Sequence, residues 1–276
     1  MFVTDSRDAF KFYAITLALA MAVAFAVPLI DEASLVVTMI TPTLAAIIML
    51  VFIAPEASFR KAISLLGLDR AGFKGWPLAI AGPAAIHLVG LAILSVAGLA
   101  VFALPQMTGP PGFATLKILS GLVIGTLFAL GEEIGWRGYM LPRIRGIGIA
   151  AAMLLVGLLH GIWHLPIMLT TDFYHSTGNP FLVVPLFLIT LTLAGVFYGF
   201  LRIWTASVWP VAIAHSTANM AWEITNEMTQ TKSALVQEYI GGESGLIMIG
   251  GLLVFGFIFI RHMRSVGFRA NLEKPF

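Results

Sequence analysis

The chain has 276 residues, of which 59% are hydrophobic and 11% carry a charge. A soluble domain usually carries roughly a quarter charged residues, so this chain lacks the polar surface that a water-soluble fold needs. The absence of cysteine excludes a disulfide framework, a thiol nucleophile and a cysteine-ligated metal. A net charge of +2 does not indicate nucleic-acid binding here, because the basic residues lie between long apolar segments.

Apolar runs long enough to cross a bilayer recur along the whole chain. A membrane-spanning helix needs about 20 mostly apolar residues. By that measure the sequence predicts eight spans, at residues 10–30, 33–54, 76–104, 121–141, 147–169, 181–201, 208–228 and 245–260. We therefore expect one integral membrane domain over residues 1–276, with an all-α, polytopic helical bundle. The basic segment 55–75 is expected to lie partly as an amphipathic helix at the membrane surface.

Basic residues are distributed unequally between the loops that these spans create. Loops on one side receive thirteen of the 16 lysines and arginines, Arg202 among them, the other side receives only Lys117 and Lys232, and Arg137 lies inside a span. The side rich in lysine and arginine is normally cytoplasmic. The pattern predicts that both termini are cytoplasmic and that the protein is a multi-pass protein of a cell membrane, the bacterial plasma membrane in our interpretation.

Ionisable side chains inside the spans form three clusters. They comprise Glu132, Glu133 and Arg137 in the fourth span, His160 and His164 in the fifth, and His215 and Asn219 in the seventh. Each such group costs about 2.5 to 3.5 kcal/mol on insertion scales, which makes it a candidate for function. Residues four apart share a helix face, so Glu133 is expected to pair with Arg137. Glu132 points elsewhere and needs another partner or a water molecule.

The depth of these residues in the membrane predicts that the clusters meet. With a rise of 1.5 Å per residue, Glu132 and Asn219 both fall near the middle of the bilayer. His215 lies slightly to the cytoplasmic side of that level and His160 slightly to the other side, while His164 lies one turn beyond His160 and fits least well. His87 in the third span is expected to make only structural contacts, because no other cluster lies near it in the sequence.

Three short motifs in this order resemble those of the CPBP intramembrane proteases. That family comprises CAAX prenyl endopeptidases of the Ras-converting type and bacterial bacteriocin-processing or immunity proteins. The first motif, Glu-Glu-x-x-x-Arg-Gly-Tyr, runs from Glu132 to Tyr139; the second, Phe-x-x-x-His, ends at His164; and the third, His-x-x-x-Asn, matches His215 and Asn219. His160 stands where the second motif usually has phenylalanine. The resemblance covers the motif-bearing helices over residues 121–228.

The resemblance implies hydrolysis of a peptide bond within the membrane, in a peptide or lipidated protein substrate. By this comparison Glu132 is the general base and His164 holds or polarises the attacking water. His215 and Asn219 would stabilise the oxyanion, and Glu133 with Arg137 would fix the geometry. This chemistry is reasonable because a carboxylate removed from water accepts a proton more readily, and preorganised donors stabilise developing charge. We expect His160 to pack beside the site or support it.

Two questions stay open from the sequence. Glu132, His164 and His215 are also a possible zinc ligand set, with His160 as a further candidate, although no His-Glu-x-x-His helix is present. We favour a mechanism that needs no metal. A catalytically silent scaffold or bacteriocin-immunity protein is an alternative function. A proton-coupled transporter would also bury such groups, but the internal repeats typical of transporters are not found.

Overall fold

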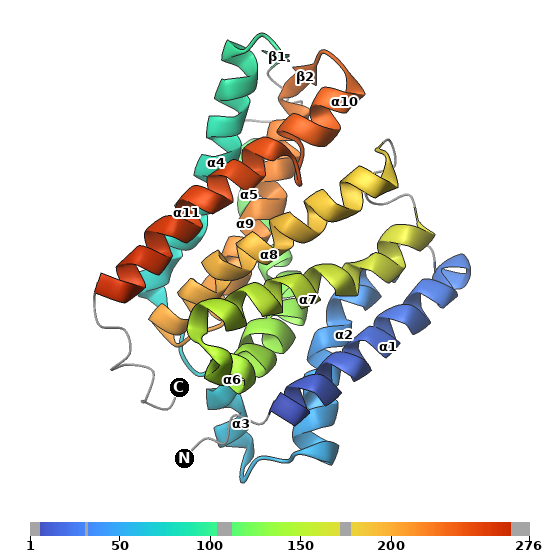
Figure 1. Ribbon diagram of the computed structural model, residues 1–276, viewed down its shortest axis with the longest axis vertical. Coiled ribbons are helices and arrows are strands. Elements are labelled where there is room, and N and C mark those ends of the chain that lie inside the picture. The colour runs from blue at the N-terminus through green and yellow to red at the C-terminus, as the bar shows by residue number, and fades with distance from the viewer. Residues whose placement is uncertain (1–5, 31–32, 104–111, 172–177, 266–276) are drawn as a thin grey trace.

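The computed structural model describes residues 6–30, 33–103, 112–171 and 178–265, and this part of the chain is almost entirely helical (Figure 1). The eight long helices are α1 (Ser6–Ile30), α2 (Ala33–Ile48), α4 (Trp76–Val96), α5 (Phe113–Glu133), α7 (Ile149–Thr170), α8 (Pro180–Thr205), α9 (Trp209–Glu227) and α11 (Leu246–Ser265). They correspond one to one with the eight predicted spans. The prediction of an all-α membrane bundle is therefore confirmed.

Shorter elements connect or extend these helices. They are α3 (Phe59–Leu66), α6 (Leu141–Ile144) and α10 (Ala234–Val236), the π-helical segments η1 (Met49–Ile53), η3 (Ile134–Met140) and η5 (Gln237–Gly241), the 3₁₀ turns η2 (Phe73–Gly75) and η4 (Arg145–Ile147), and the strands β1 (Ala100–Phe102) and β2 (Thr229–Thr231). Figure 1 shows α3 and α6 at one end of the bundle and β1, β2 and α10 at the opposite end. The connections at α3 and α6 thus lie at the end opposite strand β2, which ends just before Lys232.

Within the described residues, seven helical segments are long and apolar enough to cross a membrane, and α9 is the long helix that falls outside this set. The reason is its polar content, since it carries His215 and Asn219 together with Glu223 and Glu227. Helix α9 packs against α4, α5 and α8, and its first half from Pro210 to Thr217 is buried. Polar groups inside a bundle avoid the cost of facing lipid.

Two predicted span boundaries are wrong. Helix α4 ends at Val96 instead of residue 104, because the apolar residues that follow form strand β1, which pairs with β2 in the register Ala100 to Thr231. Apolarity alone does not distinguish such a strand from more helix. The fourth span begins at Phe113 instead of residue 121 and continues through η3 to Ile147. The motif arginine therefore lies in a π-helical segment.

The predicted surface helix in the segment 55–75 is present as α3. Ser58 accepts a hydrogen bond from the backbone N–H of Lys61, and Gly67 ends the helix in the left-handed conformation with φ of 75°. Leu65 and Leu66 are buried against the bundle, whereas Arg60 is exposed. This division of apolar and basic faces is typical of an interfacial helix.

Candidate active site

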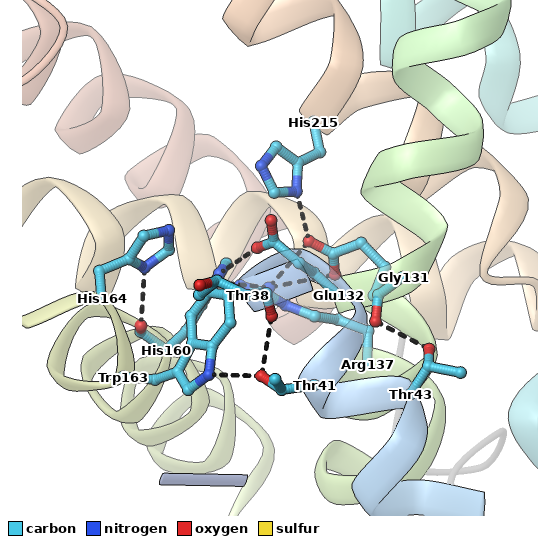
Figure 2. A network of polar contacts seen from close by, with 11 residues as sticks. Thr38, Thr41, Thr43, Gly131, Glu132, Arg137, His160, Trp163, His164 and His215 are labelled. Atoms are coloured by element: carbon cyan, nitrogen blue, oxygen red, sulfur yellow. Dashed lines mark hydrogen bonds and ion pairs between the residues drawn. The ribbon is translucent and has the colours of Figure 1, made fainter. Parts of the chain in front are cut away.

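The three motif clusters come together inside the bundle (Figure 2). The end of α5 supplies the two glutamates, η3 the arginine, α7 two histidines and α9 the third histidine. Helix α2 lies directly against the glutamates, because a Cβ atom at Gly131 would stand only 2.8 Å from the carbonyl oxygen of Met39. Thr43 of α2 donates a hydrogen bond of 2.7 Å to the carbonyl oxygen of Gly131. The carboxylates therefore sit on a rigid, closely packed turn.

Glu133 is held in a closed group of charges. Arg137 donates from Nη1 to both carboxylate oxygens of Glu133 at 3.1 Å, and both side chains are fully buried. The Nδ1 of His215 lies 2.9 Å from Oε1 of the same carboxylate, which only accepts hydrogen bonds, so this nitrogen carries the proton. The predicted Glu133–Arg137 pair is present. His215 reaches Glu133 from α9 and not the neighbouring Glu132.

Glu132 points away from that pair and meets His160. The distance from Glu132 Oε2 to His160 Nε2 is 2.8 Å, and the other ring nitrogen, Nδ1, lies 3.1 Å from Arg137 Nη1. A guanidinium only donates, so Nδ1 of His160 accepts and the ring proton sits on Nε2. His160 therefore donates to Glu132 and accepts from Arg137. The imidazole of His160 thus links the Glu132 carboxylate to Arg137, which binds the Glu133 carboxylate.

Aromatic rings fix the orientation of His160. Its ring stacks on Trp136 with centroids 5.1 Å apart, and Trp163 lies 5.7 Å away. The indole N–H of Trp163 donates to the hydroxyl of Thr41 at 3.1 Å. His160 is 0% exposed. It occupies the packing position of the usual phenylalanine, but its two hydrogen bonds make it a polar support for the site as well.

His164 lies one turn further along α7, beside the cavity. Its Nδ1 donates to the backbone carbonyl of His160 at 3.0 Å, which leaves the lone pair of the ring on Nε2. Phe187 of α8 packs edge-on against the ring at 5.3 Å. Figure 2 shows this bond between the imidazole of His164 and the carbonyl oxygen of His160.

A cavity of about 190 Å³ opens over these groups. Its polar lining includes four of the predicted residues, Glu132, His164, His215 and Asn219. Apolar side chains form most of the remaining wall, among them Leu35, Met39, Phe187, Leu191, Ala194, Phe197, Met248 and Leu252. Glu133, Arg137 and His160 lie behind this lining. The cavity thus combines a mostly apolar wall with a small set of polar groups.

Several residues at the site were missed by the sequence. His87 lines the cavity, because α4 packs directly on α9. The sequence predicts only structural contacts for His87, since no cluster lies near it along the chain. Tyr198 stacks on His215 at 5.7 Å and lies 5.0 Å from the guanidinium of Arg137. Thr190 and Glu243 also line the cavity. Only the helical spacing of Tyr198 from Phe187 and Leu191 could have indicated one of these contacts.

Arg202 is a second buried arginine, which we had counted among the loop charges. It lies in the last turn of α8 with 0% exposure. Its Nε donates to the backbone carbonyl of Arg137 at 3.1 Å, and its Nη2 donates to the carbonyl of Leu65 at 2.8 Å. This arginine therefore holds the π-helical turn of Arg137 against α3, and the prediction that it lies in a connecting loop is wrong.

The described residues contain one group that could hold a metal ion. It comprises Glu132, His160 and His164, whose possible ligand atoms lie within 4.8 Å of one another. It includes His160 in place of His215. The hydrogen bonds oppose this use of His160, because its Nε2 carries the proton while Nδ1 accepts from Arg137. A metal on Nε2 would place two donors against each other at Nδ1. His160 therefore does not fit as a ligand in this arrangement.

Comparison with known proteins agrees with the motifs. Residues 113–221 match a family model described as Rce1-like, type II CAAX prenyl endopeptidase Rce1-like. The matched segment contains all three motifs and includes α5, α7, α8 and most of α9. The search of curated proteins found no match. The match confirms the family resemblance predicted from the motifs, that of a multi-pass membrane protease family.

Proposed function

We propose that this protein is an intramembrane endopeptidase in which Glu132 activates water to hydrolyse a peptide bond. One observation carries this proposal: of two adjacent buried carboxylates, Glu133 is bound to Arg137, whereas Glu132 is not and lines a cavity together with the imidazoles of three histidines. A carboxylate placed in this way can receive the proton of a water molecule that enters the cavity.

The residues can be given separate steps. Glu132 takes a proton from water, and the oxygen adds to the substrate carbonyl carbon to form a tetrahedral intermediate. The same carboxyl then returns the proton to the departing amide nitrogen as the carbon–nitrogen bond breaks. Nε2 of His164 accepts from the water and orients it. Such positioning and proton transfer are the usual contributions of a general base.

The oxyanion would form on the α9 side of the cavity. The Glu133 carboxylate stabilises positive charge on His215, whose Nε2–H can then donate to the developing oxygen anion. Asn219, one turn further along α9, lines the cavity as well and supplies a second donor from its amide. His160 and Arg137 hold the two carboxylates apart in fixed orientations.

A prenylated peptide is the first substrate to test, because of the family match and the apolar cavity wall. Purified protein in proteoliposomes should cleave a farnesylated peptide that ends in a Cys-aliphatic-aliphatic-X tail, and a transmembrane peptide should be run beside it. Mass spectrometry of the products would locate the cleaved bond. Absence of cleavage of both, by protein that is folded, would contradict the proposal and favour a scaffold or immunity function.

The metal-free form of the mechanism has its own test. Purified active protein should contain well below one zinc ion per chain by elemental analysis, and dialysis against a chelator should leave its activity unchanged. The poor fit of His160 as a ligand supports this expectation. Stoichiometric zinc, lost together with activity and restored with it, would contradict a metal-free mechanism.

A further inference from the structure

Thr190 is a buried polar residue in the cavity that the steps above do not use. It lies on α8, is 6% exposed and lines the same cavity as Glu132 and His164. Its hydroxyl has no hydrogen-bond partner among the residues that the structure describes. A buried polar group without a partner is destabilising, so its presence in an apolar wall calls for an explanation.

Other threonines of the bundle show how unusual this hydroxyl is. A threonine in a helix commonly donates back to the carbonyl oxygen four residues earlier. Thr192, only two residues further along α8, does so to Leu188 at 2.6 Å. Thr205, also on α8, does so to Leu201 at 2.6 Å. The hydroxyl of Thr190 has no such bond and stands in the wall of the cavity.

The surroundings of Thr190 place it close to the candidate catalytic groups. Phe187, one turn earlier on the same face of α8, packs against His164 at 5.3 Å. Leu191 lies against α7, because a Cβ atom added at Gly161 of α7 would stand 3.3 Å from the Cβ atom of Leu191. The close approach of α7 and α8 thus sets Thr190 beside the turn that carries His160 and His164.

The chemistry of the wall indicates the kind of ligand. The neighbours of Thr190 on this face, Phe187, Leu191 and Ala194, offer no hydrogen bond from their side chains. A peptide that enters such a wall must satisfy its main-chain N–H and C=O groups, and a hydroxyl can donate to one or accept from the other. We propose that Thr190 is a substrate-binding residue whose hydroxyl hydrogen-bonds a main-chain peptide group of the substrate.

This inference rests on the proposed function in that the occupant of the cavity is a peptide. The bond fixes how far the substrate slides along α8, and therefore which peptide bond stands at Glu132. Loss of the hydroxyl then weakens substrate binding without weakening the protein. If Thr190 had only a structural role, loss of its hydroxyl would instead lower the stability of the protein and leave substrate binding unchanged.

Binding can be measured without cleavage in the Glu132→Gln background. The probe is the farnesylated peptide labelled with fluorescein, and the readout is its anisotropy with protein in detergent micelles. Thr190→Val has nearly the same shape but lacks the hydroxyl, and should raise the dissociation constant about tenfold, as expected for one lost hydrogen bond. Thr190→Ser keeps the hydroxyl and should bind like the parent. Thr192→Val is the matched control on the same helix and should also bind like the parent.

Thermal unfolding provides a second readout. Thr190→Val should unfold at the same or a higher temperature than the parent, because it removes a buried hydroxyl without a partner. Binding by Thr190→Val equal to the parent would overturn the inference. So would a loss of binding that Thr190→Ser shares, or that accompanies a lower unfolding temperature. Absence of saturable binding of the probe to the parent would also overturn it.

Modified peptides can identify the main-chain group of the substrate to which Thr190 hydrogen-bonds. In a series of probes, each main-chain amide in turn is replaced by an ester, which removes the N–H and weakens the carbonyl as an acceptor. At one position the difference between the parent and Thr190→Val should vanish, where the lost N–H was the partner, or fall clearly below tenfold, where the weakened carbonyl was, whereas at the others the tenfold difference should persist. A difference that persists at every position would overturn the inference. Cleavage is assayed separately, so a binding effect without any cleavage would contradict the proposed hydrolysis and leave the role of Thr190 standing.

Discussion

The surroundings of the two adjacent glutamates differ although the residues are neighbours in the chain. Glu133 lies behind the cavity wall, where it accepts hydrogen bonds from Arg137 and His215. Glu132 lines the cavity and receives one hydrogen bond from the ring of His160. Consecutive residues of a helix face different directions, so a pair of carboxylates can supply one structural and one reactive group. The comparison teaches that the packing of neighbouring helices gives two identical residue types different partners, and these partners are the basis of the roles proposed for them.

Replacing Glu132, the proposed general base, should have the largest effect on activity. Glu132→Gln keeps the size of the side chain and a hydrogen-bond acceptor but cannot take a proton from water. We expect turnover of the farnesylated peptide to fall by about three orders of magnitude or more, as is typical when a group at the centre of the chemistry is lost. The measurement is product formation in proteoliposomes. Turnover within tenfold of the parent would show that another group is the base.

Replacing the structural glutamate should affect both folding and activity. Glu133→Gln leaves Arg137 buried with a neutral partner, and loss of one member of a buried ion pair typically costs about 3 to 5 kcal/mol. We expect a clearly lower unfolding temperature in detergent than for Glu132→Gln, together with reduced turnover. Equal unfolding temperatures for the two variants would contradict the division of roles between the glutamates.

Replacing His160 should have a smaller effect than replacing either Glu132 or Glu133. His160→Phe restores the common family residue but removes the donor to Glu132 and the acceptor for Arg137. Hydrogen bonds to charged groups are worth about 1.5 to 3 kcal/mol, so we expect activity to fall about 10- to 100-fold. His160→Phe that is folded and fully active would show that His160 only packs. Complete loss with loss of bound zinc would move the mechanism to a metal ion.

Reporter fusions should show on which side of the membrane each connecting segment lies, without altering Glu132 or Glu133. Insertions in segment 55–75 and at Gly178 are expected to report the cytoplasm and the exterior respectively, because of the distribution of basic residues. Such data would place the glutamate groups relative to the two membrane faces. Both reporters on one side would contradict the eight-span topology.

Much of the fold could be read directly from the sequence. The lengths of the apolar runs predict the eight long helices, because a span of given length needs a given number of apolar residues. The spacing of four residues predicts the contact between Glu133 and Arg137, because it depends on the geometry of one helix alone. Family resemblance identified the motif residues, four of which line the cavity.

Contacts between helices needed the tertiary structure. The packing of α7, α8 and α9 decides that His215 meets Glu133, that His160 joins the two carboxylate groups, and that Thr190 lies in the wall of the cavity. The burial of Arg202 and the pairing of β1 with β2 are decided in the same way. Sequence spacing fixes neighbours within one helix, but the rotation and approach of separate helices follow from how all of their side chains pack together.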